Sequence, residues 1–520
     1  MRRAPKAEVR HEGYYVASWS NERAFVGANG IMAKMRKATK TPAEGLRISV
    51  RNFGPIAKAE NIALRPLTVF AGPGNTGKSY LAILLYSLLQ RSHHLFRKGI
   101  IGRAHKPGEP VIGSRAEKDA IDKDLRKMDK EGGLRFSQLS RATRDWAKRA
   151  MAEDFENMKE AWRKELQICM GESSMKGLTP DRKNNRPSSI RLTLKDGEKG
   201  YAWCLNKRNT AANFDSDSFD FNIKTGHNAP LNFSVRIGRD TSSVPRIVGV
   251  YRLFLNLLES SAFEELHTPA LYLPAARTGI MQSYKALASA IVSRASFSGD
   301  ISIPTLNGVL TDFLQALITI DKKGEPSAMA SIAASMEKEI LEGDIAADFS
   351  ESAYPAFVYR KGKDGAAIPI IRASSMVTEL APVILFLRYY VEKDSILIIE
   401  EPEAHLHPWA QRVVARALVQ LARSGVRVVV TTHSDYILDQ LANYVRVAGF
   451  DKKERKLMTG DEDLYLETSE VGCYVFKARE EGTLVEELQF DLEGGILPKD
   501  HEDISLGLYN ETAAILNKSQ

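Results

Sequence analysis

Eight consecutive residues of the sequence have the spacing G-x-x-x-x-G-K-[ST] of a phosphate-binding loop: Gly72, Pro73, Gly74, Asn75, Thr76, Gly77, Lys78 and Ser79. Glycines let backbone N–H groups turn towards phosphate oxygens, and a helix that follows adds the positive end of its dipole. We expect Lys78 to bridge the β and γ phosphates of ATP and Ser79 to bind Mg²⁺. We expect the cradle around the phosphates to be formed by Gly72, Gly74, Asn75, Thr76 and Gly77.

Two carboxylates end a later apolar run, where Glu400 and Glu401 follow residues 396–399. Consecutive strand residues point to opposite sides, so the two side chains meet different surroundings. We expect Glu400 to lie in the Mg²⁺ shell and Glu401 to position the attacking water. Taken alone, two such glutamates could also be an ordinary strand end in solvent.

A third candidate is His433, which follows the apolar run 426–432. Ligands of parallel sheets bind at the carboxyl ends of the strands, so a histidine at that position can reach a bound nucleotide. We expect His433 to sense the γ-phosphate. Lys78, Glu401 and His433 would then be the catalytic residues.

Hydrophobic patterning predicts the elements that must position these side chains. Residues 67–71 form an apolar strand before the loop, and leucines recur at helical spacing over residues 78–90. Between residues 374 and 442, helical segments alternate with apolar β runs at 395–399 and 426–432. That order is typical of a parallel sheet covered by helices on both faces, an α/β fold.

The remaining segments give weaker patterns. Alternating residues predict antiparallel strands at 190–194, 219–223 and 231–235, and a second antiparallel pair at 472–476 and 484–490. Further helices are expected over parts of 116–170, at 246–263, over most of 280–345 and at 504–516.

The loop, the carboxylate pair and the histidine, in this order, resemble the ABC-type ATPases of the group that contains RecF, SMC and Rad-fifty-like proteins and the OLD (overcoming lysogenization defect) ATPases. The resemblance is strongest over residues 46–90 and 370–445. It includes Asn-Phe-Gly-Pro at 52–55 and Glu-Pro-Glu-Ala-His-Leu-His-Pro at 401–408, the Walker B and D-loop block. It implies an ABC-ATPase head whose mixed or parallel sheet is covered by helices, with an antiparallel β subdomain and a helical insert.

In this group, the signature motif of one head contacts the nucleotide held by another. The resemblance therefore implies that Ser374 and Ser375 bind ATP of a second copy, although plain capping of a helix is the alternative for Ser374. The sequence departs from the pattern at Met376, where many relatives carry Gly, and at Glu400, where the broader pattern has Asp. Arg277 lies in a segment similar to one that recurs in these ATPases, and we expect it to contact phosphate or the partner head.

The chain is expected to divide into six segments. These are a basic, flexible N-terminal extension (1–45), a first ATPase lobe with the P-loop (46–110), a charged helical insert (111–189), strands with a helical subdomain (190–345), a core with the signature, Walker B and switch histidine (346–445), and a C-terminal β pair and helix (446–520).

Composition narrows the class of protein. The 520 residues are 43% hydrophobic and 26% charged, which is typical of a folded globular chain. The longest apolar stretches are far shorter than the roughly 20 residues that span a bilayer, so no membrane partner is expected. Three cysteines, far apart in sequence, fit a reducing cytoplasm.

The spacing of the motifs distinguishes between the subgroups of these ATPases. The 295 residues from Ser79 to Ser374 are too many for a transporter subunit, and the insert is too short for long SMC-type arms. Only 75 residues follow Val445, too few for the Toprim nuclease of OLD enzymes. The chain therefore resembles the stand-alone ATPase subunits of two-component anti-phage systems of the PARIS or Septu type.

That resemblance implies an ATP-hydrolysing head that forms homo-oligomers and controls a separate effector, expected to be a nuclease, in bacterial defence. A phage protein or DNA would be the trigger. Two alternatives stay open. One is a nucleotide-gated scaffold with slow hydrolysis, and the other is a RecF- or SMC-like DNA repair or maintenance ATPase that binds DNA directly.

Overall fold

The computed structural model describes residues 46–99, 113–131, 133–180, 188–193, 200–205, 210–215, 222–224, 268–296, 306–321, 326–350, 355–362, 365–488 and 499–518. They belong to one compact unit, Ala43–Gln520. The basic extension 1–45, the expected strand at 231–235 and the expected helix at 246–263 lie outside the described residues.

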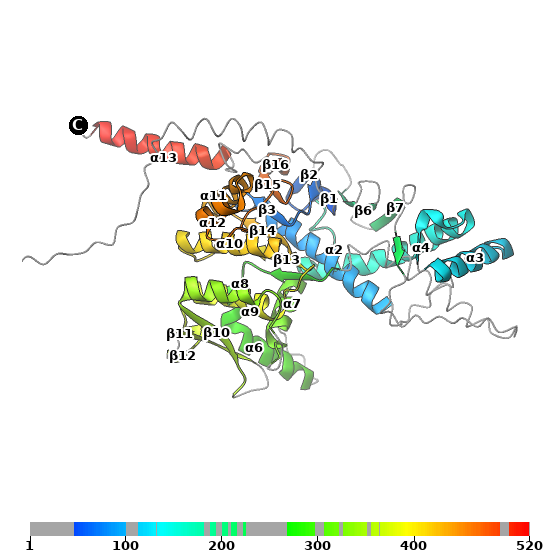
Figure 1. Cartoon of the computed structure of the whole chain (residues 1–520), viewed down its shortest axis with the longest axis horizontal. Helices are drawn as coiled ribbons and strands as arrows, with labels where there is room; N and C mark the ends of the chain where they lie inside the picture. The colour runs from blue at the N-terminus through cyan, green and yellow to red at the C-terminus, as the bar shows by residue number, and fades with distance from the viewer. Residues whose placement is uncertain are drawn as a thin grey trace, which may run out of the picture. The chain divides into compact units, whose positions relative to one another are not determined.

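An eleven-stranded mixed sheet dominates the described part of the chain, in the order β7-β6-β5-β1-β2-β16-β15-β3-β14-β13-β9 (Figure 1). Its strands are β1 (Arg47–Phe53), β2 (Ile56–Ala63), β3 (Leu67–Ala71), β5 (Ser188–Thr193), β6 (Gly200–Leu205), β7 (Thr210–Asp215), β9 (Ala270–Leu273), β13 (Ile396–Glu400), β14 (Arg427–Thr432), β15 (Val471–Lys477) and β16 (Thr483–Leu488). Two small antiparallel sheets join β10 (Gly343–Asp348), β11 (Ala356–Lys361) and β12 (Ala367–Pro369), and β4 (Gly133–Arg135) with β8 (Asn222–Lys224).

The described helices are α2 (Lys78–Gly99), α3 (Arg115–Glu131), α4 (Arg141–Met170), α6 (Arg277–Ser296), α7 (Gly308–Ile318), α8 (Ala330–Met336), α9 (Ser375–Tyr389), α10 (Pro408–Arg423), α11 (Asp435–Arg446), α12 (Lys452–Thr459) and α13 (Lys499–Lys518), together with a π-turn, η3 (Glu337–Leu341), after α8. Local chemistry sets several of their first turns. Ser374 and Ser434 cap α9 and α11 by accepting backbone N–H groups, and Pro408 stands in the first turn of α10. None of the helices in the described ranges is long and apolar enough to cross a membrane.

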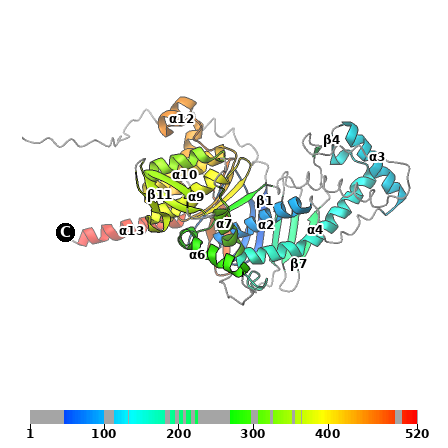
Figure 2. The same cartoon turned by 90° about the horizontal axis from the view of Figure 1, so that it is seen from below.

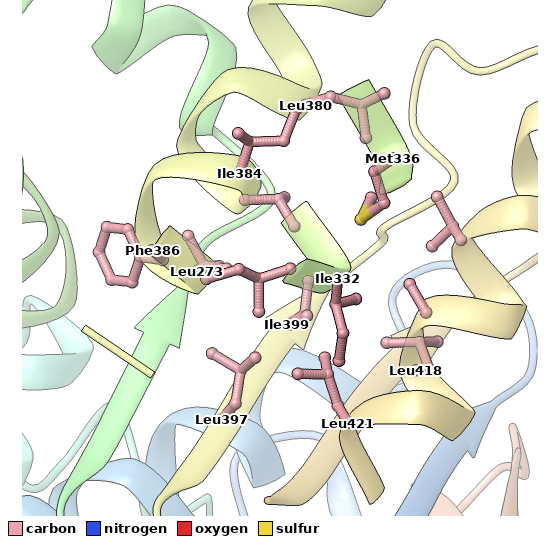
Figure 3. Packing of buried hydrophobic residues seen from close by; sticks show 14 of the residues in the cluster. Leu273, Ile332, Met336, Leu380, Ile384, Phe386, Leu397, Ile399, Leu418 and Leu421 are labelled. Atoms are coloured by element: carbon pink, nitrogen blue, oxygen red, sulfur yellow. The ribbon is translucent and has the colours of Figure 1, made fainter. Parts of the chain in front are cut away.

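Helices pack on both faces of the parallel strands. On β13, Leu397 and Ile399 enter a core formed with α8, α9 and α10 (Figure 3), to which α11 also contributes. Ile396 and Ile398 enter a second core formed with α2 and α4. Figure 2 shows α2 and α4 running side by side, and the two helices are in contact. A strand that is buried on both faces needs a continuous apolar run, which explains the sequence of β13. The expected α/β fold class is confirmed.

The C-terminal pair has an unexpected place in the sheet. β15 and β16 pair antiparallel, as the sequence predicts, but the pair inserts between β2 and β3. β15 pairs in parallel with β3, so that Val475 lies opposite Ala71, and β16 pairs in parallel with β2. The strand that leads into the phosphate-binding loop therefore has one neighbour from the far end of the chain.

Candidate nucleotide-binding site

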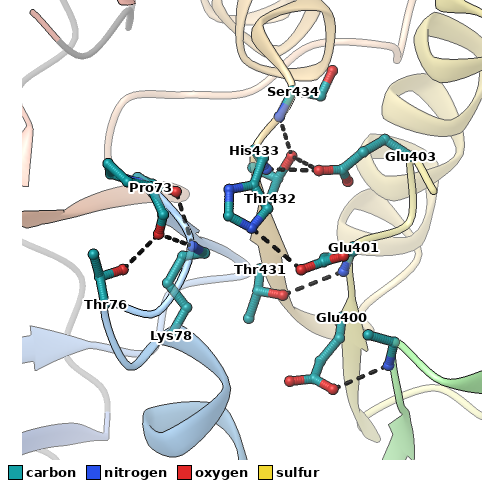
Figure 4. Close-up of polar contacts among 12 residues, drawn as sticks. Pro73, Thr76, Lys78, Glu400, Glu401, Glu403, Thr431, Thr432, His433 and Ser434 are labelled. Carbon is teal, nitrogen blue, oxygen red and sulfur yellow. Dashed lines mark hydrogen bonds and ion pairs between the residues drawn. The ribbon is translucent and has the colours of Figure 1, made fainter. Parts of the chain in front are cut away.

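Four neighbouring parallel strands end at one edge of the sheet and carry the candidate residues. β3 leads into the loop at 72–79, β14 into His433, β13 into Glu401, and β9 into the segment before Arg277. The strand ends are in register, because Ala71 pairs with Thr432 and Thr431 with Glu400. Figure 4 shows Lys78, Glu400, Glu401 and His433 around the same region. This is the edge at which ligands of parallel sheets bind.

The loop at 72–79 has the backbone that a phosphate cradle requires. Asn75, Gly72 and Gly77 have φ values of 57°, 130° and 94°. The Lys78 ammonium donates to the carbonyl oxygens of Gly72 at 2.8 Å and Pro73 at 2.7 Å, and Thr76 Oγ1 also donates to Pro73 O. The lysine thus lies over its own loop, where phosphate oxygens would replace the carbonyls. Ser79 is exposed beside it.

A methyl group at Gly72 would clash with the backbone of β15. A Cβ atom there would lie 2.7 Å from Phe476 O of β15, whereas one at Gly74 would have nothing within 4 Å. Because the backbone of β15 cannot move away cheaply and φ is positive, Gly72→Ala is expected to lower the free energy of unfolding by about 2 to 3 kcal/mol. Urea unfolding measures this. Gly74→Ala is the control, and an equal loss in both variants would contradict the close approach of β15.

Burial lowers the pKa of Lys78 to about 8, although Glu401, Glu403 and Glu400 oppose this shift. The protonated ammonium is the form that attracts phosphate, so ATP binding is expected to weaken once the pH exceeds about 8. The loss should approach tenfold in Kd per pH unit. Titration with a fluorescent ATP analogue between about pH 7.5 and 9.5 keeps the triphosphate fully ionised. Lys78→Arg, which does not lose its proton in this range, should give a flat profile. A flat wild-type profile would contradict the prediction.

Glu400 has the surroundings of a cation ligand. Its side chain is 5% exposed, and Oε2 accepts the Ala275 N–H at 3.0 Å. Its second oxygen, Oε1, is buried, and the buried hydroxyl of Tyr272 is a neighbouring group that interacts with this carboxylate. A buried carboxylate is costly unless it is well satisfied, and a magnesium ion or one of its waters would supply a strong partner. The residues present therefore fit Mg²⁺, with Ser79 as the second candidate ligand.

Glu401 has a strained backbone and a partner on its side chain. Its φ is 42°, and its N–H donates to Thr431 O at 2.9 Å. Glu401 Oε1 lies 3.2 Å from His433 Nε2. This hydrogen bond lowers the pKa of Glu401, so the carboxylate is ionised and available as a base. Both side chains are partly exposed, and solvent reaches the pair.

A third glutamate, Glu403, was not expected at the site. Its Oε1 accepts Thr432 Oγ1 at 2.8 Å and the His433 N–H at 2.6 Å, so it fixes the backbone that carries His433. Burial raises the pKa of Glu403. Only its place in the 401–408 block pointed to it, because a lone carboxylate three residues after a strand end predicts no contact.

Two expectations concern residues beside this group. Ser374 and Ser375 are exposed at the start of α9, where Ser374 Oγ accepts the Val377 N–H. No hydrogen bond within the described ranges joins either serine to the P-loop, so their role towards a second copy stays a prediction. Arg277, in contrast, is 0% exposed and donates to backbone carbonyls. The structure thus places Arg277 behind the carboxylates, and the expectation that it contacts phosphate or a partner head is not supported.

Comparison with known proteins identifies the class of one segment. Residues 281–438 match the model of the family described as AAA ATPase domain. The matched segment contains Glu400, Glu401 and His433, and the P-loop lies upstream of it. Residues 281–438 are thus similar to an AAA ATPase domain, and the match covers less than half of the chain. No curated protein matches the sequence.

The solved structures that the chain resembles include three SMC heads. An SMC head bound to the C-winged helix domain of ScpA has 10% identity and a TM-score of 0.36, over 86% of this chain and 98% of that chain. The SMC head domain from Thermotoga maritima has 8% identity and a TM-score of 0.31, over 86% and 100%. A head with an extended coiled coil, bound to the C-terminal domain of ScpA derived from Pyrococcus furiosus, has 9% identity and a TM-score of 0.32, over 90% and 99%.

Proposed function

We propose that this chain is a magnesium-dependent ATPase whose heads associate when ATP is bound. The observation that carries the proposal is the convergence of Lys78, Glu400, Glu401 and His433 at the ends of three neighbouring parallel strands. The AAA ATPase match over residues 281–438 supports the same activity from sequence.

Each residue has a task in this mechanism. The amides of the loop and Lys78 hold the phosphates, and Ser79 with Glu400 would hold Mg²⁺, which when bound offsets charge on the β and γ phosphates. Glu401 accepts the proton of the attacking water and orients it towards the γ-phosphate. His433, whose backbone is fixed by Glu403, holds the Glu401 side chain in place.

Self-association would use the exposed first turn of α9. Ser374, Ser375 and the free N–H groups of this turn would meet the γ-phosphate held by a second copy. ATP would then lie between two heads, each of which supplies part of the enclosure. Met376, which is half-buried, stands where many relatives have Gly, and its side chain limits how closely the two backbones approach.

We further propose that the assembled heads control a separate nuclease in anti-phage defence, with a phage protein or DNA as the trigger. This step is supported by the resemblance to the two-component systems. The neighbouring reading frame tests it, because a Toprim or His-Asn-His nuclease is expected there.

One observation favours the scaffold as the second candidate function. Glu401 Oε1 lies 3.2 Å from His433 Nε2, so one of the two oxygens that could accept the proton of water is already engaged. An enzyme with this pair intact would hydrolyse ATP slowly, and bound ATP would then set the assembly while hydrolysis resets it.

The test combines turnover with molecular mass. We expect ATP hydrolysis that requires Mg²⁺, and a mass on size exclusion with light scattering that at least doubles when ATP is added. Assembly with ATP but without measurable turnover would favour the scaffold. If the protein is a monomer under every nucleotide condition, the proposal that two heads share each ATP site is overturned.

A further inference from the structure

A buried ion pair connects the carboxylate loop to the helix that begins at the signature serines. Arg277, at the start of α6, is 0% exposed, and Glu379 on α9 is 1% exposed. Arg277 Nη2 forms an ion pair with Glu379 Oε1, and Thr278 Oγ1 donates to Glu379 Oε2. Both oxygens of this carboxylate therefore face the first turn of α6. A charge pair fully removed from water is expensive unless its geometry is fixed by further hydrogen bonds.

Those further hydrogen bonds end on the candidate catalytic residues. Arg277 Nη1 donates to Glu400 O at 2.5 Å and to Pro274 O at 3.2 Å, and Nη2 donates to Glu401 O at 2.8 Å. The planar guanidinium thus spans the two successive carbonyls of the carboxylate pair, which a lysine ammonium cannot do with the same geometry.

Glu401 needs such a support. With φ at 42°, it occupies a conformation that costs a non-glycine residue energy and persists only when its surroundings fix it. Its N–H is held by Thr431 O, and its carbonyl accepts both Arg277 Nη2 and the Ala404 N–H. Removing Arg277 therefore removes one of the contacts that fix the backbone of Glu401. The Glu401 side chain, which faces His433, is then less well positioned.

We propose that the Arg277–Glu379 pair positions Glu400 and Glu401 and couples them to helix α9, so that docking of a second copy on the first turn of α9 is transmitted to the carboxylates. Ser374 caps this helix, and Glu379 lies five residues further along it. A shift of α9 moves Glu379, and through Arg277 it moves the two carbonyls. The coupling rests on the proposed function, whereas the positioning role rests on the contacts alone.

Two variants test the pair, and a third is a matched control. Arg277→Lys keeps the positive charge and loses the planar guanidinium that reaches both carbonyls. Glu379→Gln removes the negative charge of this side chain from α9. Arg388→Lys changes an arginine at the other end of α9, which pairs with Glu337 and donates to Ile345 O without touching the carboxylate loop. If Arg277→Lys does not fold, the positioning role is tested with Glu379→Gln and Thr278→Val instead.

The first measurement is amide hydrogen exchange over residues 400–407, without nucleotide and with a non-hydrolysable ATP analogue. Both test variants are expected to exchange at least about tenfold faster there without nucleotide, while Arg388→Lys matches the wild type. The analogue should change exchange in this segment of the wild type and leave Arg277→Lys unchanged. Wild-type exchange in both test variants, or an equal gain in Arg388→Lys, would overturn the proposal.

The second measurement is steady-state hydrolysis. The test variants are expected to lose at least about tenfold in kcat with KM within about threefold of the wild type, because positioning affects the reaction more than binding. Parallel loss of ATP affinity and kcat would show a general structural role and overturn the proposal. If the wild type hydrolyses no ATP, the proposed ATPase activity fails, and the exchange data alone decide whether the pair joins α9 to the carboxylates.

Discussion

Glu401→Gln is expected to lower the rate of ATP hydrolysis by about 10²- to 10⁴-fold, because the amide cannot accept the proton of the attacking water. The amide keeps the shape of the side chain and can still form a hydrogen bond with His433. ATP affinity should therefore stay within about threefold of the wild type, as expected for a residue that acts in the reaction and not in binding. Hydrolysis by phosphate release and affinity by fluorescent-nucleotide titration give the two values.

The control for this variant is Glu462→Gln, which changes a partly exposed glutamate in the segment after α12 and should leave turnover unchanged. Wild-type turnover in Glu401→Gln would remove Glu401 from the reaction and make Glu400 or Glu403 the next candidates. ATP-dependent assembly that persists in the slow variant would show that bound ATP, without hydrolysis, is sufficient to join the heads.

Lys78→Ala is expected to weaken ATP binding by at least about 10²-fold, and turnover and assembly should be lost with it. A charge-assisted contact of a buried ammonium with phosphate contributes about 3 kcal/mol, which corresponds to roughly two powers of ten in Kd. The structure adds a second reason, because Lys78 Nζ also ties the carbonyls of Gly72 and Pro73 together. Isothermal titration with MgATP measures the loss.

Lys58→Ala is the matched control, since this lysine lies on β2, is exposed and pairs with Glu60. It should bind ATP as the wild type does. Thermal unfolding of Lys78→Ala without nucleotide separates loss of binding from loss of fold. ATP affinity within a factor of about three of the wild type would contradict the assignment of the P-loop.

The parts of the site that could be predicted are those that depend on a few consecutive residues. An apolar run followed by Gly-x-x-x-x-Gly-Lys-Ser, by Glu-Glu or by Thr-His defines a strand and the residues at its end, and parallel strands place such ends at one edge. That Lys78, Glu400 and His433 lie near one another follows from this rule, whereas the order of the four parallel strands does not. Their chemical roles stay predictions.

The contacts that could not be predicted are those between distant segments. Arg277 donates to carbonyls more than 120 residues away, and a backbone carbonyl has no signature in the sequence. Glu403 holds His433 through a backbone N–H, which likewise has no signature in the sequence. The insertion of β15 beside β3 joins segments about 400 residues apart, and the alternating pattern of β15 predicted a strand without its neighbours.

The position of β15 also bears on how the molecule is made. On the ribosome, β3 and the turn that follows it emerge about 400 residues before β15, the strand that completes their hydrogen bonding. Phe476, whose carbonyl stands against Gly72, is part of that late segment. A nascent chain therefore cannot complete the strand pairing beside its phosphate-binding loop until β15 has been translated, and a fragment truncated before Val471 would lack this neighbour of β3.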